Sequence, residues 1–99
     1  MQDKVKIGYR TYVIKEDGIA DKSENWGDII HKTGEIHIEE SLSLQHKQEI
    51  LLHEIIHGIG AICMNDELIE KQISSLAYAF AMVIRDNPQM FMDIIKGLK

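Results

Sequence analysis

The first forty residues alternate between apolar and polar positions with the two-residue period of β-strands. Residues 4–14 place β-branched and aromatic side chains among polar ones, which predicts a strand or a bent hairpin. Two more short runs, residues 29–31 and 35–39, flank a turn in which Gly34 can supply a positive φ. We therefore predict a second hairpin, and we expect residues 21–25 to be a loop or one helical turn.

After residue 43 the apolar positions recur at helical spacing. Residues 44–62 carry such a stripe, and Ser43 is placed to cap the helix that they predict. A second helix is predicted from about Asp66 to the residue before Pro88, because proline disfavours helical geometry at its predecessor. Residues 89–98 predict a short terminal helix. Its expected docking face consists of Met90, Phe91, Ile94, Ile95 and Leu98.

Length and composition narrow the class of protein. The 99 residues, 44% apolar and 27% charged, are enough for one domain spanning residues 1–99, and strands followed by helices predict an α+β fold. The formal net charge of −5 argues against nucleic acid as a partner. No apolar run approaches the roughly 18 to 20 residues of a membrane span. With no apolar leader and one cysteine, we expect a cytoplasmic protein.

The run His53-Glu54-Ile55-Ile56-His57 is the strongest chemical signal in the chain. Residues four apart lie on one face of a helix, so both imidazoles can point at one cation and occupy two corners of a zinc tetrahedron. Glu54 projects beside them, close enough to take a proton from a metal-bound water. Random shuffling of this composition gives the pattern with a probability of only about 2%. The sequence therefore predicts a Zn²⁺ site.

A catalytic zinc ion usually has three protein ligands and a water, so a third ligand is needed. Glu70 is the first choice, because it lies near the start of the second helix on the face shared with Ile73 and Ala77. Glu67, one turn earlier, is the alternative. Glu70 can also be interpreted as a solvated glutamate in the first turn of the helix, where the helix dipole favours a negative charge. This alternative stays open.

Cys63 is a further alternative for the third ligand. The residues from His57 to Gly60 follow the longer HExxHxxGxxH pattern, but Cys63 stands where the third histidine would be. A thiolate would blunt the Lewis acidity that hydrolysis needs, so we expect Cys63 to be a small buried apolar residue. We expect Gly58 and Gly60 to end or bend the helix.

The residues that would face a substrate are less sharply defined. Tyr78, Tyr12 and His37 are all candidates for stabilising an oxyanion. Zincins commonly bind an extended peptide against a sheet edge, and residues 35–39 are the natural strand for that role. The remaining histidines are expected on half-exposed faces: His31, His37 and His46.

These motifs resemble small metallopeptidase-like proteins of phages and mobile elements that are related to the ImmA/IrrE family. The resemblance covers about residues 27–88. It rests on the segment 34–38 (Gly-Glu-Ile-His-Ile), on 51–57 (Leu-Leu-His-Glu-Ile-Ile-His), on Glu70 with the apolar positions that follow it, and on the closing Asp-Asn-Pro at 86–88.

The resemblance implies a minimal zincin, in which a small antiparallel or mixed sheet packs on the HExxH helix and on a second, ligand-bearing helix. It implies that His53 and His57 bind zinc, that Glu54 is the catalytic glutamate and that Glu70 is the acidic ligand. It also implies endopeptidase activity, often directed against a repressor that is encoded nearby.

Two functions remain open on these grounds. The first is a zinc-dependent metalloendopeptidase that acts on a protein or peptide substrate, with Glu54 as general base. The second is a zinc-binding interaction module of a phage or mobile element, whose metal site is structural or vestigial. Three ligands and a water favour hydrolysis, whereas a closed site of four ligands, for example one including Cys63, favours the module.

Overall fold

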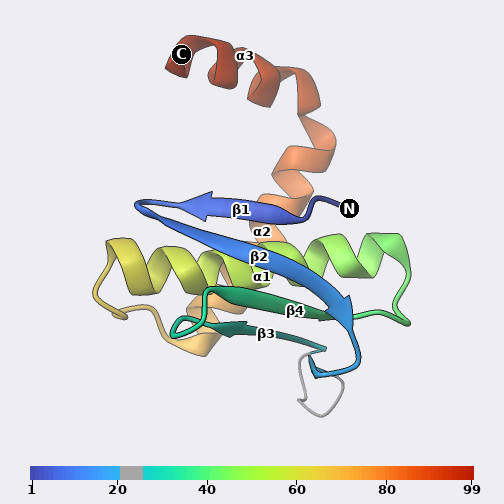
Figure 1. The fold of residues 1–99 in the computed structure, drawn as a ribbon. Coiled ribbons are helices and arrows are strands. Elements are labelled where there is room, and N and C mark those ends of the chain that lie inside the picture. Colours follow the sequence, from blue (N-terminus) through green and yellow to red (C-terminus); the bar gives the residue numbers. More distant parts are fainter. Residues whose placement is uncertain (21–25) are drawn as a thin grey trace.

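A computed structural model describes residues 1–20 and 26–99, and the segment 21–25, predicted as a loop or helical turn, lies outside the described residues. The described strands are β1 (Lys4–Ile7), β2 (Arg10–Asp17), β3 (Gly27–Ile30) and β4 (Glu35–Glu39). The described helices are α1 (Leu44–Cys63), α2 (Glu70–Asp86) and α3 (Pro88–Leu98). Figure 1 shows the strands on one side of α1, with α2 on the other side.

The four strands form one mixed sheet in the order β1-β2-β4-β3. The pairs β1–β2 and β3–β4 are antiparallel, which confirms both predicted hairpins, and Gly34 has the expected positive φ of 73°. Between them, β2 and β4 run parallel, with Ile14 opposite Ile36. The sheet and helices together confirm an α+β fold with a mixed sheet.

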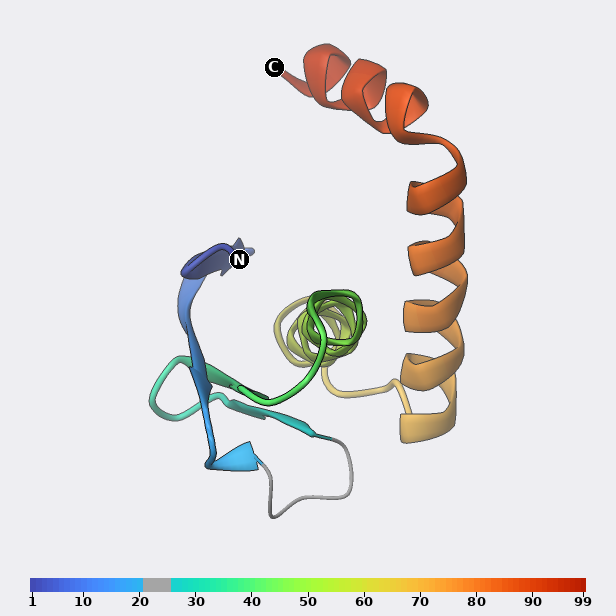
Figure 2. The same cartoon turned by 90° about the vertical axis from the view of Figure 1, so that its right-hand side faces the viewer.

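β4 lies inside the sheet, so the expectation that it provides a free edge for a peptide is wrong. One edge of β4 pairs with β3, and its other edge pairs in parallel with β2. The pairing with β2 joins residues about twenty positions apart in the sequence. The outer strand on this side is β3, which follows α1 closely. Figure 2 looks along α1 and shows β3 below it and α2 beside it.

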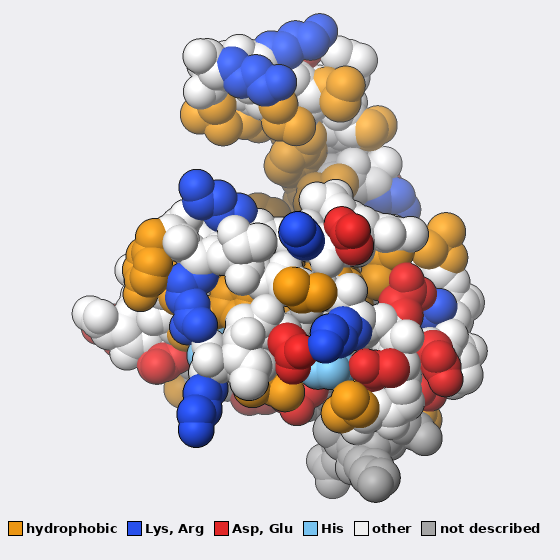
Figure 3. Space-filling model, in the orientation of Figure 1, with side chains coloured by type: hydrophobic (Ala, Val, Ile, Leu, Met, Phe, Trp, Pro, Cys, Tyr) orange, Lys and Arg blue, Asp and Glu red, His pale blue; other side chains and the backbone are white. Residues whose placement is uncertain are grey.

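The face of the sheet that is turned away from α1 carries charged side chains (Figure 3). Lys15 Nζ lies 2.6 Å from Glu35 Oε2, and His37 Nδ1 lies 2.8 Å from Asp17 Oδ2. These neighbours leave His37 only 3% exposed, so the expectation of a half-exposed ring is wrong. The ring is buried because its ion-pair partners on β2 and β4 close over it.

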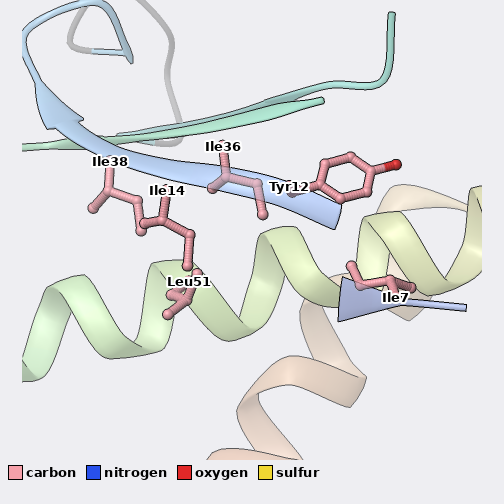
Figure 4. Packing of buried hydrophobic residues seen from close by; sticks show 6 residues of the cluster. All are labelled: Ile7, Tyr12, Ile14, Ile36, Ile38 and Leu51. Carbon is pink, nitrogen blue, oxygen red and sulfur yellow. The ribbon is translucent and has the colours of Figure 1, made fainter. Parts of the chain in front are cut away.

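The main core fills the space between the sheet and α1 (Figure 4). Tyr12, Ile36 and Ile38 are fully buried there, and Leu51 of α1 packs against them. Ser43 caps α1 as predicted, because its hydroxyl accepts a hydrogen bond of 3.2 Å from the His46 amide. This core fixes the position of α1 on the sheet.

Gly58 and Gly60 lie within α1, which runs on to Cys63, so the expectation that they end the helix is wrong. A Cβ on Gly58 would stand 2.6 Å from Cδ1 of Ile7 and 3.3 Å from Cδ1 of Ile29. Gly58 therefore serves a close approach between α1 and the sheet rather than a turn.

α2 begins at Glu70, four residues later than predicted. Asn65 and Asp66 have left-handed φ values of 51° and 59°, which suit a turn and break helical geometry. The side chain of Gln72 instead accepts a hydrogen bond of 3.0 Å from the Ile69 amide at the helix start. A second core cluster of Ile56 with residues of α2 joins this helix to α1.

α3 buries none of its residues, so its expected docking face is not docked within this chain. Figures 1 and 2 show α3 standing clear of the sheet and of α1, joined only to the end of α2. Among the residues that the structure describes, no helix combines the length and apolar character needed to cross a membrane.

Replacing Ile36 by Ala should lower the free energy of unfolding by about 3 kcal/mol, because Ile36 is fully buried and truncation leaves a cavity. Urea denaturation followed by circular dichroism measures this change. The control is Ile19→Ala, whose side chain is 59% exposed and should change stability by less than about 0.5 kcal/mol. Equal losses in both variants would contradict the core described above.

Candidate metal centre

The structure brings together three of the predicted site residues. Glu70 places Oε1 2.9 Å from Nε2 of His53 and Oε2 2.9 Å from Nε2 of His57. One ligand atom from each residue lies within 4.8 Å of the others, a spacing that allows all three to bind one metal ion. The two imidazoles come from successive turns of α1 and the carboxylate from the first turn of α2.

The local environment of His53 fits a metal ligand. Its Nε2 atom is buried and has no hydrogen-bond partner among the described residues, although Glu70 lies at ion-pair distance. Ligand atoms around a tetrahedral zinc ion are about 3.4 Å apart, so small side-chain movements would admit the ion. The donor set of two imidazoles and a carboxylate is one that zinc accepts.

The alternative third ligands lie outside this group. Cys63 is exposed at the end of α1, six residues beyond His57, which is about 9 Å along a helix. The expectation that Cys63 is buried is therefore wrong. Glu67 is exposed in the connection before α2. Among the described residues, only Glu70 joins the two histidines in a potential metal site.

Glu54 faces a different side of α1 and is only 3% exposed. Burial raises its pKa to about 8, and the negative charges of Asp28 and Glu70 add to the effect. Gly27 of β3 makes this burial possible, because a Cβ there would stand 2.3 Å from Cγ2 of Ile50 and 3.2 Å from Oε2 of Glu54. In the absence of a nearby cation, Glu54 therefore holds a proton at neutral pH.

Burial lowers the pKa of His57 below its ordinary 6.5. Glu70 opposes this effect, while the neighbouring imidazoles of His53 and His31 strengthen it. His57 is consequently neutral near pH 7, and a neutral imidazole has the lone pair that metal binding requires.

His31 approaches the centre from the sheet. Its Nδ1 lies 2.9 Å from the hydroxyl of the fully buried Tyr12, and the guanidinium of Arg10 donates a hydrogen bond to its carbonyl oxygen. Electrostatic interaction with the His31 ring contributes to the lowered pKa of His57. No local sequence pattern predicts this position of His31, because its contact with Tyr12 joins residues nineteen positions apart.

Of the three predicted oxyanion candidates, only Tyr78 is exposed, and it lies eight residues beyond Glu70 on α2, about 12 Å along the helix. Tyr12 is fully buried against His31, and His37 lies on the opposite face of the sheet. Tyr78 is 70% exposed and lines a groove of about 1010 Å³ between α1 and α2. The groove reaches His53 and is lined mainly by apolar side chains.

Comparisons of the chain with protein-family models, with curated proteins and with solved structures found no match.

The buried Glu54 makes the stability of the metal-free protein depend on pH. Its folded-state pKa, about 8, lies above the ordinary 4.5, so the folded state holds a proton that the unfolded state releases as pH rises between these values. The contribution of this group to the free energy of unfolding is fully present below about pH 4.5 and falls by about 1.4 kcal/mol per pH unit within the window.

Glu54→Gln removes this titration while keeping the shape of the protonated side chain. With a chelator present, we expect the variant to match the wild type near pH 5 and to become progressively more stable than it toward pH 8. Urea denaturation across this pH range measures the difference. The titration of His57 is common to both proteins and largely cancels. A difference that stays constant with pH would contradict the raised pKa.

Loss of a ligand should weaken zinc binding. We expect His53→Ala and Glu70→Gln each to weaken it by roughly 100-fold or more, because each removes a directly coordinating atom. Competition with a chromophoric chelator measures the affinity. The control is His46→Ala, seven residues before His53 and outside the cluster, which should bind zinc like the wild type. Equal weakening in all three variants would count against this centre.

Proposed function

We propose that this protein is a zinc-dependent metalloendopeptidase with a zincin-like centre, related to the ImmA/IrrE family. The observation that carries the proposal is the convergence of His53, His57 and Glu70 within 4.8 Å, with the buried carboxyl of Glu54 on the adjoining face of α1. Three protein ligands leave one position of a tetrahedral zinc ion open for water or substrate, which is the arrangement of catalytic rather than structural sites.

Zinc bound at this centre would polarise the peptide carbonyl and make an attacking water more acidic. Positive charge close to Glu54 favours the carboxylate form and therefore lowers its pKa from the value of about 8 in the metal-free protein. Glu54 then serves as general base, taking a proton from the attacking water and passing it to the leaving amine. Asp28 opposes full ionisation and keeps the carboxyl a competent acid for the second transfer.

The proposed peptide-binding edge is β3 rather than β4. β3 is the outer strand next to α1, and Gly27 at its start lies against Glu54. An extended peptide pairing with this strand would lie along the centre, from Glu54 toward His31 beyond the other end of β3. The expected substrate is an unfolded or extended segment of a protein, such as a repressor.

The alternative is a zinc-binding interaction module of a phage or mobile element, with a structural or vestigial metal. The observation that favours it is the large exposed apolar surface of α2 and α3, which is typical of a protein that binds another chain. The centre itself argues the other way, since a structural zinc site is normally closed by four protein ligands and the described group contains three.

Glu54→Gln separates the two functions. We expect the zinc-loaded variant to keep its metal but to cleave an unfolded test protein at least about 100-fold more slowly, because it lacks the general base. Cleavage is followed by gel electrophoresis and mass spectrometry, and zinc content by elemental analysis. Glu40→Gln is the control, an exposed glutamate outside both the centre and the groove, and should leave the rate unchanged. If zinc-loaded wild type cleaves nothing, the interaction module replaces the peptidase.

A further inference from the structure

The second half of α2 is apolar on every side. From Leu76 to Ile84 the helix has nine consecutive residues without a polar side chain other than the phenol of Tyr78. A helix that is apolar all round is normally buried on all sides. Here α2 buries only Ile73 and Ala77, both against α1. Most of its apolar surface is therefore uncovered within one chain.

The same surface continues onto α3. Between residues 76 and 98, all of which the structure describes, eleven large apolar side chains are between 36% and 81% exposed. They are Leu76, Tyr78, Phe80, Met82, Val83, Ile84, Met90, Met92, Ile94, Ile95 and Leu98. We call residues 76–98 the helical arm. Figure 3 shows hydrophobic side chains of α3 turned toward the body of the protein and basic side chains on its outer side.

The chain exposes more surface than a typical monomer of its mass, and the excess is as large as the area that one partner buries in a stable interface. The accessible surface of the chain is 6834 Å², whereas a folded monomer of 11.4 kDa is expected to expose roughly 5,800 Å². The excess of about 1,000 Å² exceeds the roughly 800 Å² that each partner buries in a standard interface. The arm accounts for it, since about half the surface of eleven large side chains is on the order of 1,000 Å².

The groove between α1 and α2 matches α3 in length and chemistry. α3 has 11 residues and is about 16 Å long. The groove follows α1 from Leu44 to Ile55, a stretch of about 17 Å, and continues along α2 to Arg85. Glu49 lines the groove, and the end of α3 carries Lys96 and Lys99, so opposite charges accompany the apolar match.

We propose that the protein forms a symmetric dimer by arm exchange, in which the apolar face of α3 of each copy occupies the groove between α1 and α2 of the other. A second copy fits because each chain has both the unfilled groove and the unpartnered helix, and a two-fold axis satisfies both at once. α3 does not fill the groove of its own chain, since none of its residues is buried. The inference is independent of the proposed peptidase activity.

Sedimentation equilibrium tests the association. Wild type should have about twice the chain mass of 11.4 kDa at micromolar concentration. Ile95→Glu should weaken the dimer by roughly 100-fold, because the symmetric interface contains the substitution twice at about tenfold each. Circular dichroism should show an unchanged fold at equal monomer content, since Ile95 is 50% exposed and touches no core. The matched control is Ile19→Glu, 59% exposed outside the arm, which should dimerise like the wild type.

A second measurement tests the arrangement with the wild-type protein alone. In a mixture of labelled and unlabelled chains, isotope-filtered NOEs should connect Ile94, Ile95 or Leu98 of one copy with Leu44 or Leu52 of the other. If the protein were still monomeric at about 100 μM, roughly 100 times the concentration at which the dimer is expected, the proposal would be overturned. So would an open series of larger oligomers, equal effects of Ile95→Glu and Ile19→Glu, or a dimer without these contacts between copies.

Discussion

The burial of α1 on two sides is the constraint on which the rest of the structure depends. One side of α1 packs on the sheet through Leu51, and another packs on α2 through Ile56. A helix fixed along two directions cannot rotate about its axis without losing one of the two cores. The other side chains of α1 therefore have fixed orientations, with His53 and His57 directed toward Glu70 of α2 and Glu54, on a different side, directed toward β3.

Features set by neighbouring residues were well predicted from the sequence. Both hairpins, the cap at Ser43 and the extent of α1 follow from alternation, turn chemistry and helical spacing within short windows. The three side chains that converge in the candidate centre were also named from the sequence, because two lie four residues apart on one helix. The third, Glu70, was chosen as an acid on an otherwise apolar helix face, with its alternatives left open.

Features set by distant contacts were not predicted. The interior position of β4 depends on its parallel pairing with β2, and the burial of His37 depends on Asp17 of β2 as well as on Glu35 of its own strand. The contact between Tyr12 and His31 is likewise non-local. Amphipathic spacing in α3 predicts that one face is apolar but not which surface covers it, and no residue of α3 is buried within this chain.

Gly27 of β3, which has no side chain, affects the acidity of Glu54. A methyl group on Gly27 would meet Ile50 at 2.3 Å, so either that side chain or the strand would have to move away from α1. If the strand moved, water would reach the Glu54 carboxyl and its pKa would return toward 4.5. The absence of a side chain at Gly27 thus lets β3 pack closely on α1. This close packing excludes water from the Glu54 carboxyl and keeps its pKa high.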